Sequence, residues 1–151
     1  MIVFLDFDGV THPEPCGVDA LFGRLPLIEA VLLEFAAPRI VISSSWRQVH
    51  SLDELRAFFS ADMAARVIDV TPILEWLDDD SLPGQLPRFE RQWECEHWMR
   101  ENRPSGAPWL AIDDRAHWFR PQCPHLLLTD PHHGFQPDDA ARLRAMIKER
   151  L

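Results

Sequence analysis

Short, continuous runs of apolar residues alternate with longer segments of helical character along this chain of 151 residues. Such runs are typical of strands that are buried on both faces of a sheet. They fall at Ile2–Leu5, Arg39–Ser43, Val67–Val70, Trp109–Asp113 and His125–Thr129. Strands that alternate with helices predict a mainly parallel sheet covered by helices on both faces. We therefore expect an α/β fold of three layers.

The segments around these runs have the apolar spacing or the end signals of helices. Pro26 suits the first turn of a helix that continues through "PLIEAVLLEFA". Ser51 and Glu54 form a capping box, which indicates the start of another helix. Acidic residues behind Pro137 suit the first turn of the last helix. The expected helices therefore cover residues 26–36, 51–67 and 88–102 and the segment that begins at residue 137.

Length and composition indicate one domain over residues 1–151, in the cytoplasm. The apolar runs are far shorter than a membrane span, so we expect no membrane partner. The first residues lack the charged lead and long apolar stretch of a signal peptide. Three cysteines without paired spacing argue against a disulfide framework and against a zinc site. They are Cys16, Cys95 and Cys123.

The formal net charge of −9 limits the kinds of partner. Broad, non-specific binding of nucleic acid depends on Lys and Arg that neutralise phosphates, so we do not expect it. A locally basic pocket could still accept the end of a nucleic acid. Part of the acidity lies in the run Asp78–Asp80, which we interpret as a solvated loop.

Polar side chains stand at the ends of three of the apolar runs. Asp6 and Asp8 follow the first run, Ser43–Ser45 end the second, and Asp113 and Asp114 end the fourth. The carboxyl ends of parallel strands meet at one edge of a sheet, where ligands bind. Carboxylates without Cys or His favour a magnesium ion. Carboxylates can also attack phosphorus or transfer protons, so the set predicts phosphoryl-transfer chemistry.

The ordered set of motifs resembles the haloacid dehalogenase-like (HAD) hydrolase superfamily. "FLDFDGV" resembles its first motif, "IVISS" its second and "LAIDD" its fourth, and together they span residues 2–114. Within the superfamily, "ISSSWR", "RQWECEHW" and "LAIDDR" are similar to small members associated with bacterial nucleic-acid repair. The resemblance implies a Rossmann-like, three-layer sandwich and a phosphatase activity.

The resemblance also implies the roles of individual residues. Asp6 would be the nucleophile that forms an aspartyl-phosphate, and Asp8 would be the general acid and base. Ser43 would bind the transferred phosphoryl group, or Ser44 if the strand ends one residue later. The second acid of the first motif, Asp8, is retained, which favours phosphatase over dehalogenase chemistry.

A basic residue and a metal shell complete the implied site. Arg91 stands where the third motif places a Lys or Arg, and Arg88 is the alternative. Arg presents a planar fork where Lys presents a point charge, so the geometry there differs from the more common form. The implied magnesium ligands are Asp6, Asp8 through its backbone carbonyl, Asp113, and Asp114 directly or through water.

The spacing of the motifs leaves no room for a large cap domain between the first two strands. An open site suits a large phosphorylated substrate, such as a nucleic-acid end or a phosphoprotein. Trp46 and Trp118 are candidate substrate platforms, and Arg47 either binds substrate or packs on Trp46. The substrate and the oligomeric state are left open.

Three alternatives compete with this interpretation. One is a phosphatase of small metabolites or nucleotides. Another is a binding module that keeps the fold without catalysis. A receiver-like phosphate acceptor would have its accepting Asp at the end of a mid-chain strand and a Lys late in the chain, but Lys148, the only lysine, lies in the expected last helix.

Overall fold

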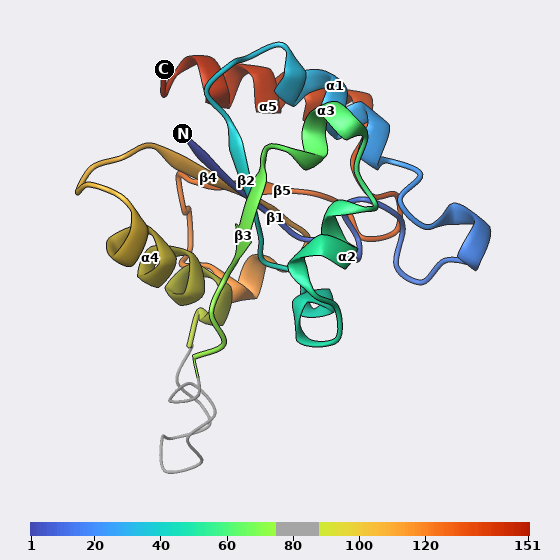
Figure 1. The fold of residues 1–151 in the computed structure, drawn as a ribbon, viewed down its shortest axis with the longest axis horizontal. Coiled ribbons are helices and arrows are strands. Elements are labelled where there is room, and N and C mark those ends of the chain that lie inside the picture. Colours follow the sequence, from blue (N-terminus) through green and yellow to red (C-terminus); the bar gives the residue numbers. More distant parts are fainter. Residues whose placement is uncertain (75–87) are drawn as a thin grey trace.

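The computed structural model describes residues 1–74 and 88–151, and its centre is a sheet of five parallel strands. The strands lie in the order β3-β2-β1-β4-β5, and Figure 1 shows β1 in the middle of the sheet. Their bounds are β1 Ile2–Leu5, β2 Arg39–Ile42, β3 Val67–Val70, β4 Trp109–Asp113 and β5 Leu126–Leu128. The predicted α/β class and the parallel sheet are confirmed. The acidic run Asp78–Asp80 lies outside the described residues.

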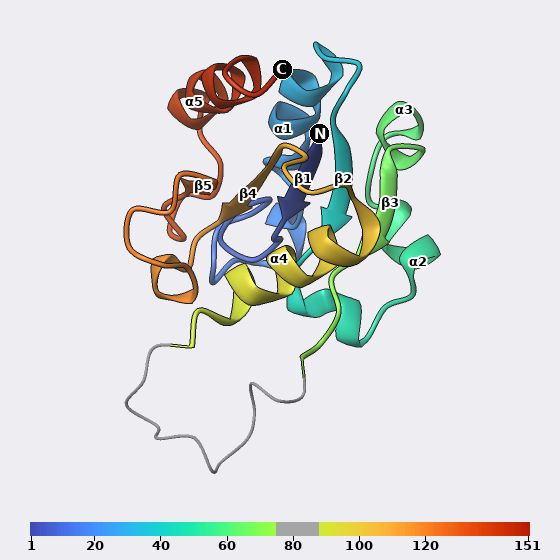
Figure 2. The ribbon, with the colours of Figure 1, turned by 90° about the vertical axis from the view of Figure 1, so that its left-hand side faces the viewer.

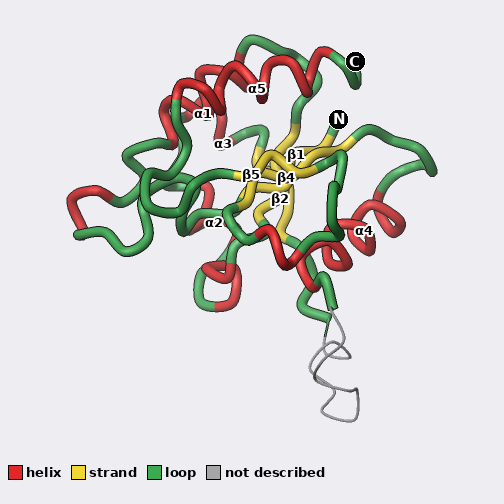
Figure 3. The backbone as a smooth tube through the Cα atoms, turned by 180° about the vertical axis from the view of Figure 1, so that it is seen from behind, coloured by secondary structure: helices red, strands yellow, loops and turns green. Residues whose placement is uncertain are grey.

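Helices cover the two faces of the sheet unequally. Figures 2 and 3 show α4 on one side of the strands and α1 and α5 on the other. The helices are α1 Leu25–Leu33, α2 Leu52–Arg56, α3 Ala61–Ala64, α4 Glu90–Asn102 and α5 Pro137–Lys148. None of these described helices is both long enough and apolar enough to cross a membrane.

The alternation of side chains along β1 divides the apolar core in two. Val3 and Leu5 point into a large core that includes buried residues of α1, α2, α3 and α5. Ile2 and Phe4 point into a smaller core against α4, where Phe4 meets the ring of Trp98 edge to face. Because successive strand residues face opposite sides, one short apolar run anchors both layers of helices.

The segment 51–67, expected as one helix, was predicted wrongly. The Ser51–Glu54 capping box is present, but α2 ends at Arg56 and a new helix, α3, begins at Ala61. The hydroxyl of Ser60 accepts a hydrogen bond from the Met63 N–H and caps α3. A serine there satisfies the first free N–H groups of a new helix, so the chain turns instead of continuing.

The strand register brings the predicted motifs to one level. Leu5 pairs with Ile42 of β2 and with Ile112 of β4. The ladder continues one step further, because Asp6 N–H donates to Ile112 O and Ser43 N–H donates to Leu5 O. The residues that follow β1, β2 and β4 therefore lie together at the carboxyl edge of the sheet.

Candidate active site

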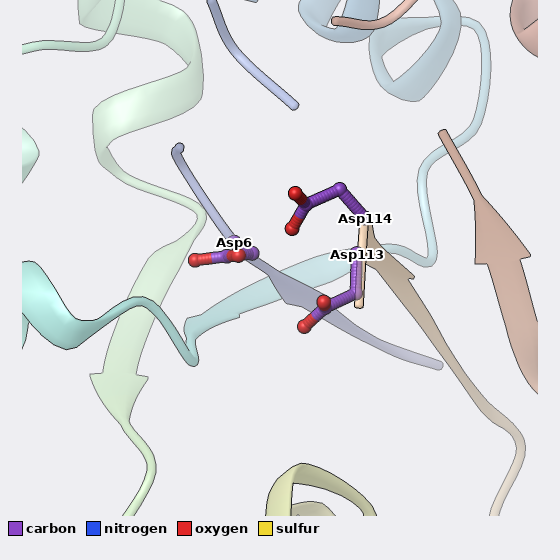
Figure 4. Close-up of side chains that lie close together, drawn as sticks. All are labelled: Asp6, Asp113 and Asp114. Carbon is purple, nitrogen blue, oxygen red and sulfur yellow. The ribbon is translucent and has the colours of Figure 1, made fainter. Parts of the chain in front are cut away.

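Three carboxyl side chains gather where β1 and β4 end. Asp6 follows β1, Asp113 is the last residue of β4, and Asp114 comes next. One oxygen of each lies within 4.8 Å of the others, and all three residues are buried. Figure 4 shows the three side chains at the ends of the two strands. Because buried like charges at this spacing repel each other, the cluster needs a compensating cation.

Arg91 brings one positive charge to the cluster from the first turn of α4. Its Nη1 lies 3.1 Å from Asp113 Oδ2 and 3.5 Å from Asp6 Oδ1. The ring of Trp118 covers the guanidinium, with 5.0 Å between Arg91 Cζ and the ring centroid. Arg91 is therefore held beside the two acids, at the place where the third motif requires a basic side chain.

Burial and crowding change the protonation of these groups. Burial raises the pKa of Asp113 to about 8; the Arg91 guanidinium opposes this rise and the Asp6 carboxylate adds to it. Burial and then Asp6 raise the pKa of Asp114 to about 6. Burial disfavours the charged form of Arg91, but the carboxylates of Asp113, Asp6 and Glu94 outweigh it and raise its pKa. A divalent cation would displace the protons that these carboxyls hold near neutral pH.

The carboxyl group of Asp114 fits a metal site. Both of its oxygens are buried and have no hydrogen-bond partner among the described residues. The Arg115 Nε lies 3.4 Å from Asp114 Oδ2, which is an ion-pair distance with no hydrogen bond. Buried polar oxygens are normally paired. Two unpaired carboxylate oxygens beside two further carboxyls form the oxygen-only donor set that magnesium prefers.

The loop after β1 packs closely against this carboxyl group. Gly9 has a φ of +73°, and a Cβ atom added there would lie 2.6 Å from Asp114 Cγ. A glycine is therefore required both by the backbone conformation and by the space that Asp114 occupies. The carbonyl of Gly9 also accepts a hydrogen bond of 2.8 Å from the Thr129 hydroxyl, which fixes the loop on the residues after β5.

Asp8 stands apart from the three-acid cluster. Its side chain is 35% exposed, and its two oxygens face different nitrogen atoms. Oδ1 lies 2.9 Å from His12 Nε2, and Oδ2 accepts a 3.1 Å hydrogen bond from Trp46 Nε1. Asp6 and Asp8 nevertheless line the same cavity of about 80 Å³. The two acids of the first motif thus lie in different surroundings beside one space, as different roles would require.

The three serines after β2 lie in three different settings. Ser43 is buried, and its N–H donates to Leu5 O, which places it level with Asp6. The Ser44 hydroxyl accepts a hydrogen bond from the Trp46 N–H and caps a short 3-10 turn. Ser45 lines the cavity that Asp6 and Asp8 also line. Phosphoryl binding by Ser43 or Ser44 stays a prediction, and Ser45 is a further candidate that sequence reasoning missed.

The description "HAD domain in Swiss Army Knife RNA repair proteins" belongs to a family model that matches residues 2–140 of the chain. The chain belongs to this family. The match covers the strands and loops that carry all four motifs. No curated protein and no solved structure matches the chain. Membership of a HAD family agrees with the five-stranded parallel sheet and with the acidic cluster at its carboxyl edge.

Arg47 and Trp46 have other contacts in this HAD domain than the sequence suggested. The Arg47 side chain is 4% exposed and lies 2.9 Å from Glu94 Oε1. It also donates to the backbone carbonyls of Ser43, Ser44 and Thr71. Arg47 therefore holds together the backbone after β2 and β3, and it also lines a cavity of about 270 Å³ beside the site. Trp46 packs among aromatic side chains and donates to Asp8, and its use as a substrate platform stays a prediction.

Arg115 is another residue that sequence reasoning missed. Its backbone N–H donates to Asp113 Oδ1 at 2.8 Å, and its Nη2 lies 2.8 Å from Glu14 Oε2. It lines the small cavity together with Glu14. The only sequence signal was its place directly after the two acids of the fourth motif. Arg115 thus connects the loop after β4 with the long loop after β1.

Two cavities at the carboxyl edge of the sheet meet around Ser45, Arg91 and Trp118. The small one contains Asp6, and the other has a volume of about 270 Å³ and extends to Ile73. A cavity of about 460 Å³ lies beside Trp109, where β4 begins, and is lined by none of the predicted site residues. Its larger volume therefore does not make it the candidate active site. The two smaller cavities, which Arg91 lines, remain the candidate active site.

Proposed function

We propose that this HAD domain is a magnesium-dependent phosphomonoester hydrolase that forms an aspartyl-phosphate on Asp6. The cluster of Asp6, Asp113 and Asp114 beside the Arg91 guanidinium carries this proposal. A site of this kind combines a nucleophile, an oxygen-only metal shell and a fixed positive charge. These are the parts that phosphoryl transfer needs for positioning and for charge stabilisation.

The reaction has two steps on one phosphorus atom. An oxygen of Asp6 attacks phosphorus while the bond to the substrate oxygen breaks, and Asp8 gives that leaving oxygen a proton. Asp8 then takes a proton from a water molecule, which attacks the phosphorus and releases inorganic phosphate and Asp6. Arg91 stabilises negative charge on the phosphoryl oxygens, and a serine hydroxyl after β2 donates a hydrogen bond to them.

Asp6, Asp113, Asp114 and the backbone carbonyl of Asp8 would hold the magnesium ion. Bound there, it would offset the negative charge of the carboxylates and of the phosphoryl group. The oxygens of Asp114 support this assignment, because neither accepts a hydrogen bond from the described residues. The cytoplasmic location also remains a proposal, and three cysteines without a disulfide suit a reducing compartment.

We further propose that the substrate is the phosphorylated end of a nucleic acid. The family description names RNA repair proteins. The small cavity at Asp6 opens toward the larger one at Ile73, so a phosphoryl group could lie in one while the rest of a long substrate extends into the other. Residues 18–20 form only one 3-10 turn between β1 and α1, which leaves that side without a cap domain.

The decisive experiment compares the wild type with Asp6→Asn in the presence of magnesium. We expect the wild type to release phosphate from an aryl phosphate and the variant to show no turnover above background. Asp130→Asn, an exposed acid beyond β5, is the matched control and should keep full activity. Full activity of Asp6→Asn, or no turnover of any phosphomonoester by the wild type, would show that the proposal is wrong.

A substrate screen separates the remaining possibilities. It would include oligonucleotides with a 5′- or 3′-phosphate, mononucleotides, phosphopeptides and sugar phosphates at equal concentration. We expect the highest kcat/KM with an oligonucleotide end. A preference for sugar phosphates or mononucleotides would instead indicate a phosphatase of small molecules. Calorimetry that detects neither magnesium nor phosphate binding would favour a catalytically silent binding module.

A further inference from the structure

The carboxyl group of Asp8 is held by two N–H donors that none of the four motifs includes. His12 Nε2 lies 2.9 Å from Asp8 Oδ1, and Trp46 Nε1 donates to Asp8 Oδ2 across 3.1 Å. Each oxygen thus has one fixed partner. A carboxylate oxygen has two lone-pair sites, so each keeps one site for a proton. The two contacts hold the plane of the carboxyl group while leaving it able to transfer a proton.

The hydrogen bonds around His12 fix which nitrogen of its ring carries the proton. The backbone N–H of Phe22 donates to His12 Nδ1 at 3.2 Å, so Nδ1 is the acceptor. The hydroxyl of Thr11 lies 3.1 Å from Nδ1 and 3.0 Å from Phe7 O, so it can donate its single hydrogen to either acceptor. Nε2 therefore carries the hydrogen and points it at Asp8. His12 itself is 1% exposed, so its ring has little freedom to turn.

The indole of Trp46 is fixed by the rings around it. It meets Phe22 and Phe58 edge to face, with centroid distances of 5.3 and 5.7 Å, and it stacks on His50 at 5.4 Å. Edge-to-face and stacked pairs are favourable arrangements of aromatic rings. The donor that faces Asp8 is therefore held by the apolar core, although the Asp8 carboxyl group itself lines the small cavity with Asp6.

We propose that His12 and Trp46 are positioning residues that hold the Asp8 carboxyl group toward the leaving oxygen for proton transfer. This inference rests on the proposed function, because it concerns the proton that Asp8 gives to the leaving oxygen. A fixed carboxyl group matters most when the leaving oxygen is strongly basic and cannot depart without a proton. The need is small when the leaving group is a stable anion such as 4-nitrophenolate.

Two pairs of variants separate the effect of the N–H donors on Asp8 from the effect of side-chain packing. Trp46→Phe keeps an aromatic ring in the cluster and removes the N–H that faces Asp8. His12→Asn can still accept the Phe22 N–H but is too short to reach Asp8, whereas His12→Gln can place an amide donor near the position of Nε2. His50→Ala removes the ring stacked on Trp46 without touching Asp8, so it controls for general disturbance of the cluster.

The measured quantity is kcat/KM in magnesium for 4-nitrophenyl phosphate and for phenyl phosphate, whose leaving oxygen is more basic. General acid catalysis contributes about 10²–10⁴-fold, so we expect Trp46→Phe and His12→Asn to lose at least about tenfold with phenyl phosphate. The same variants should lose less than about threefold with 4-nitrophenyl phosphate. His12→Gln should recover part of the loss, and His50→Ala should show no difference between the substrates.

A second measurement separates positioning from a merely structural role. In an Asp8→Asn background, Trp46→Phe should cause no further loss with either substrate, because the group that it positions no longer transfers a proton. The magnesium concentration for half-maximal activity should be the same in Trp46→Phe and in the wild type. Melting temperatures would verify that each variant is folded.

The outcomes distinguish this inference from the proposed function. Equal losses with both substrates, or a further loss in the Asp8→Asn background, would overturn the positioning role while leaving the phosphatase intact. Absence of turnover by the wild type would instead overturn the phosphatase itself. Recovery by His12→Gln but not by His12→Asn, restricted to phenyl phosphate, is the pattern that only the positioning role predicts.

Discussion

At the scale of single residues, the approach of Gly9 to Asp114 determines where the third carboxyl group of the cluster lies. The chain turns at Gly9 with a φ of +73°, and the Asp114 carboxyl occupies the space that a Cβ atom would fill. The orphaned oxygens of Asp114 are held there without a hydrogen bond. The position of a proposed metal ligand thus depends on the absence of a side chain at Gly9.

Gly9→Ala should therefore weaken magnesium binding by displacing the Asp114 carboxyl group. Gly106→Ala is a matched control, since Gly106 also has a positive φ, of +81°, but has no atom within 4 Å of an added Cβ. Both variants should lose about 1–2 kcal/mol of unfolding free energy from the left-handed backbone. Only Gly9→Ala should lose the magnesium-dependent rise in melting temperature. An unchanged magnesium response in Gly9→Ala would contradict this assignment.

The protonation of Asp113 and Asp114 predicts how magnesium affinity changes with pH. Their pKa values are raised to about 8 and about 6, so protons compete with the cation below these values. The apparent affinity should therefore rise as the pH increases from 6 to 8, with release of protons on binding. Calorimetry in two buffers of different ionisation enthalpy measures that release. Affinity that is constant over this range would contradict the assignment of the metal to these carboxyls.

The acids of the site could be predicted from the sequence, whereas the groups that hold them could not. Asp6 and Asp113 each stand at the end of an apolar run, and parallel strands place such ends at one edge. His12 stands among proline and glycine residues, and nothing in that loop indicates that its ring returns to Asp8. Such a contact depends on the path of an irregular loop, which has no periodicity to reveal it.

At the scale of secondary-structure elements, the apolar runs predicted all five strands, and the errors lie where chains turn. The segment 51–67 has helical composition throughout, but Ser60 begins a new helix within it. The short turn at residues 45–48 follows the serines and was not expected. Local propensity does not determine where a helix stops when a hydroxyl can cap a second one. Capping hydrogen bonds therefore set these boundaries.

Arg47 links three elements and positions α4, the helix that carries Arg91. It donates to carbonyls after β2 and β3 and pairs with Glu94 of α4 at 2.9 Å. Without Arg47, the buried Glu94 carboxylate keeps only Arg91, 3.6 Å away, as a partner among the described residues, so Arg47→Met should lower the unfolding free energy by about 3 kcal/mol. Denaturation in urea measures this loss.

Two further variants test the origin of that loss. Arg144→Ala breaks an exposed ion pair with Glu34 and should change stability little. Adding Glu94→Leu to Arg47→Met removes the carboxylate that has lost its nearer partner, so the double variant should lose less than the sum of the single variants. A loss for Arg47→Met no larger than that for Arg144→Ala would contradict the role of Arg47 as a buried link.

At the scale of the whole molecule, the charge and the site impose opposite demands on a nucleic-acid substrate. The net charge of −9 repels a phosphate backbone, while Arg91 and the proposed magnesium attract one phosphate. Recognition should therefore be confined to the end of the strand. One domain over residues 1–151 stays a prediction, as does the absence of a membrane partner.

Competition between oligonucleotides tests this confinement. An oligonucleotide without a terminal phosphate should inhibit hydrolysis of its phosphorylated counterpart only weakly, even at a concentration about tenfold above the KM of that substrate. Inorganic phosphate should inhibit in competition with the substrate. Strong inhibition by the unphosphorylated oligonucleotide, weakening steeply as salt increases, would show that the backbone is bound along its length and would contradict the prediction.

The strand order also has a consequence for the order in which a ribosome makes the chain. β1 comes before the other four strands of this sheet in the sequence, yet it lies in the centre of the sheet, between β2 and β4. The second edge of β1 can pair only after β4 has been made, because Ile2 pairs with Trp109. Until β4 has been synthesised, one edge of β1 is unpaired, and Asp6 lies without Asp113 and Asp114. A growing chain therefore remains without its candidate active site until most of the domain has been made.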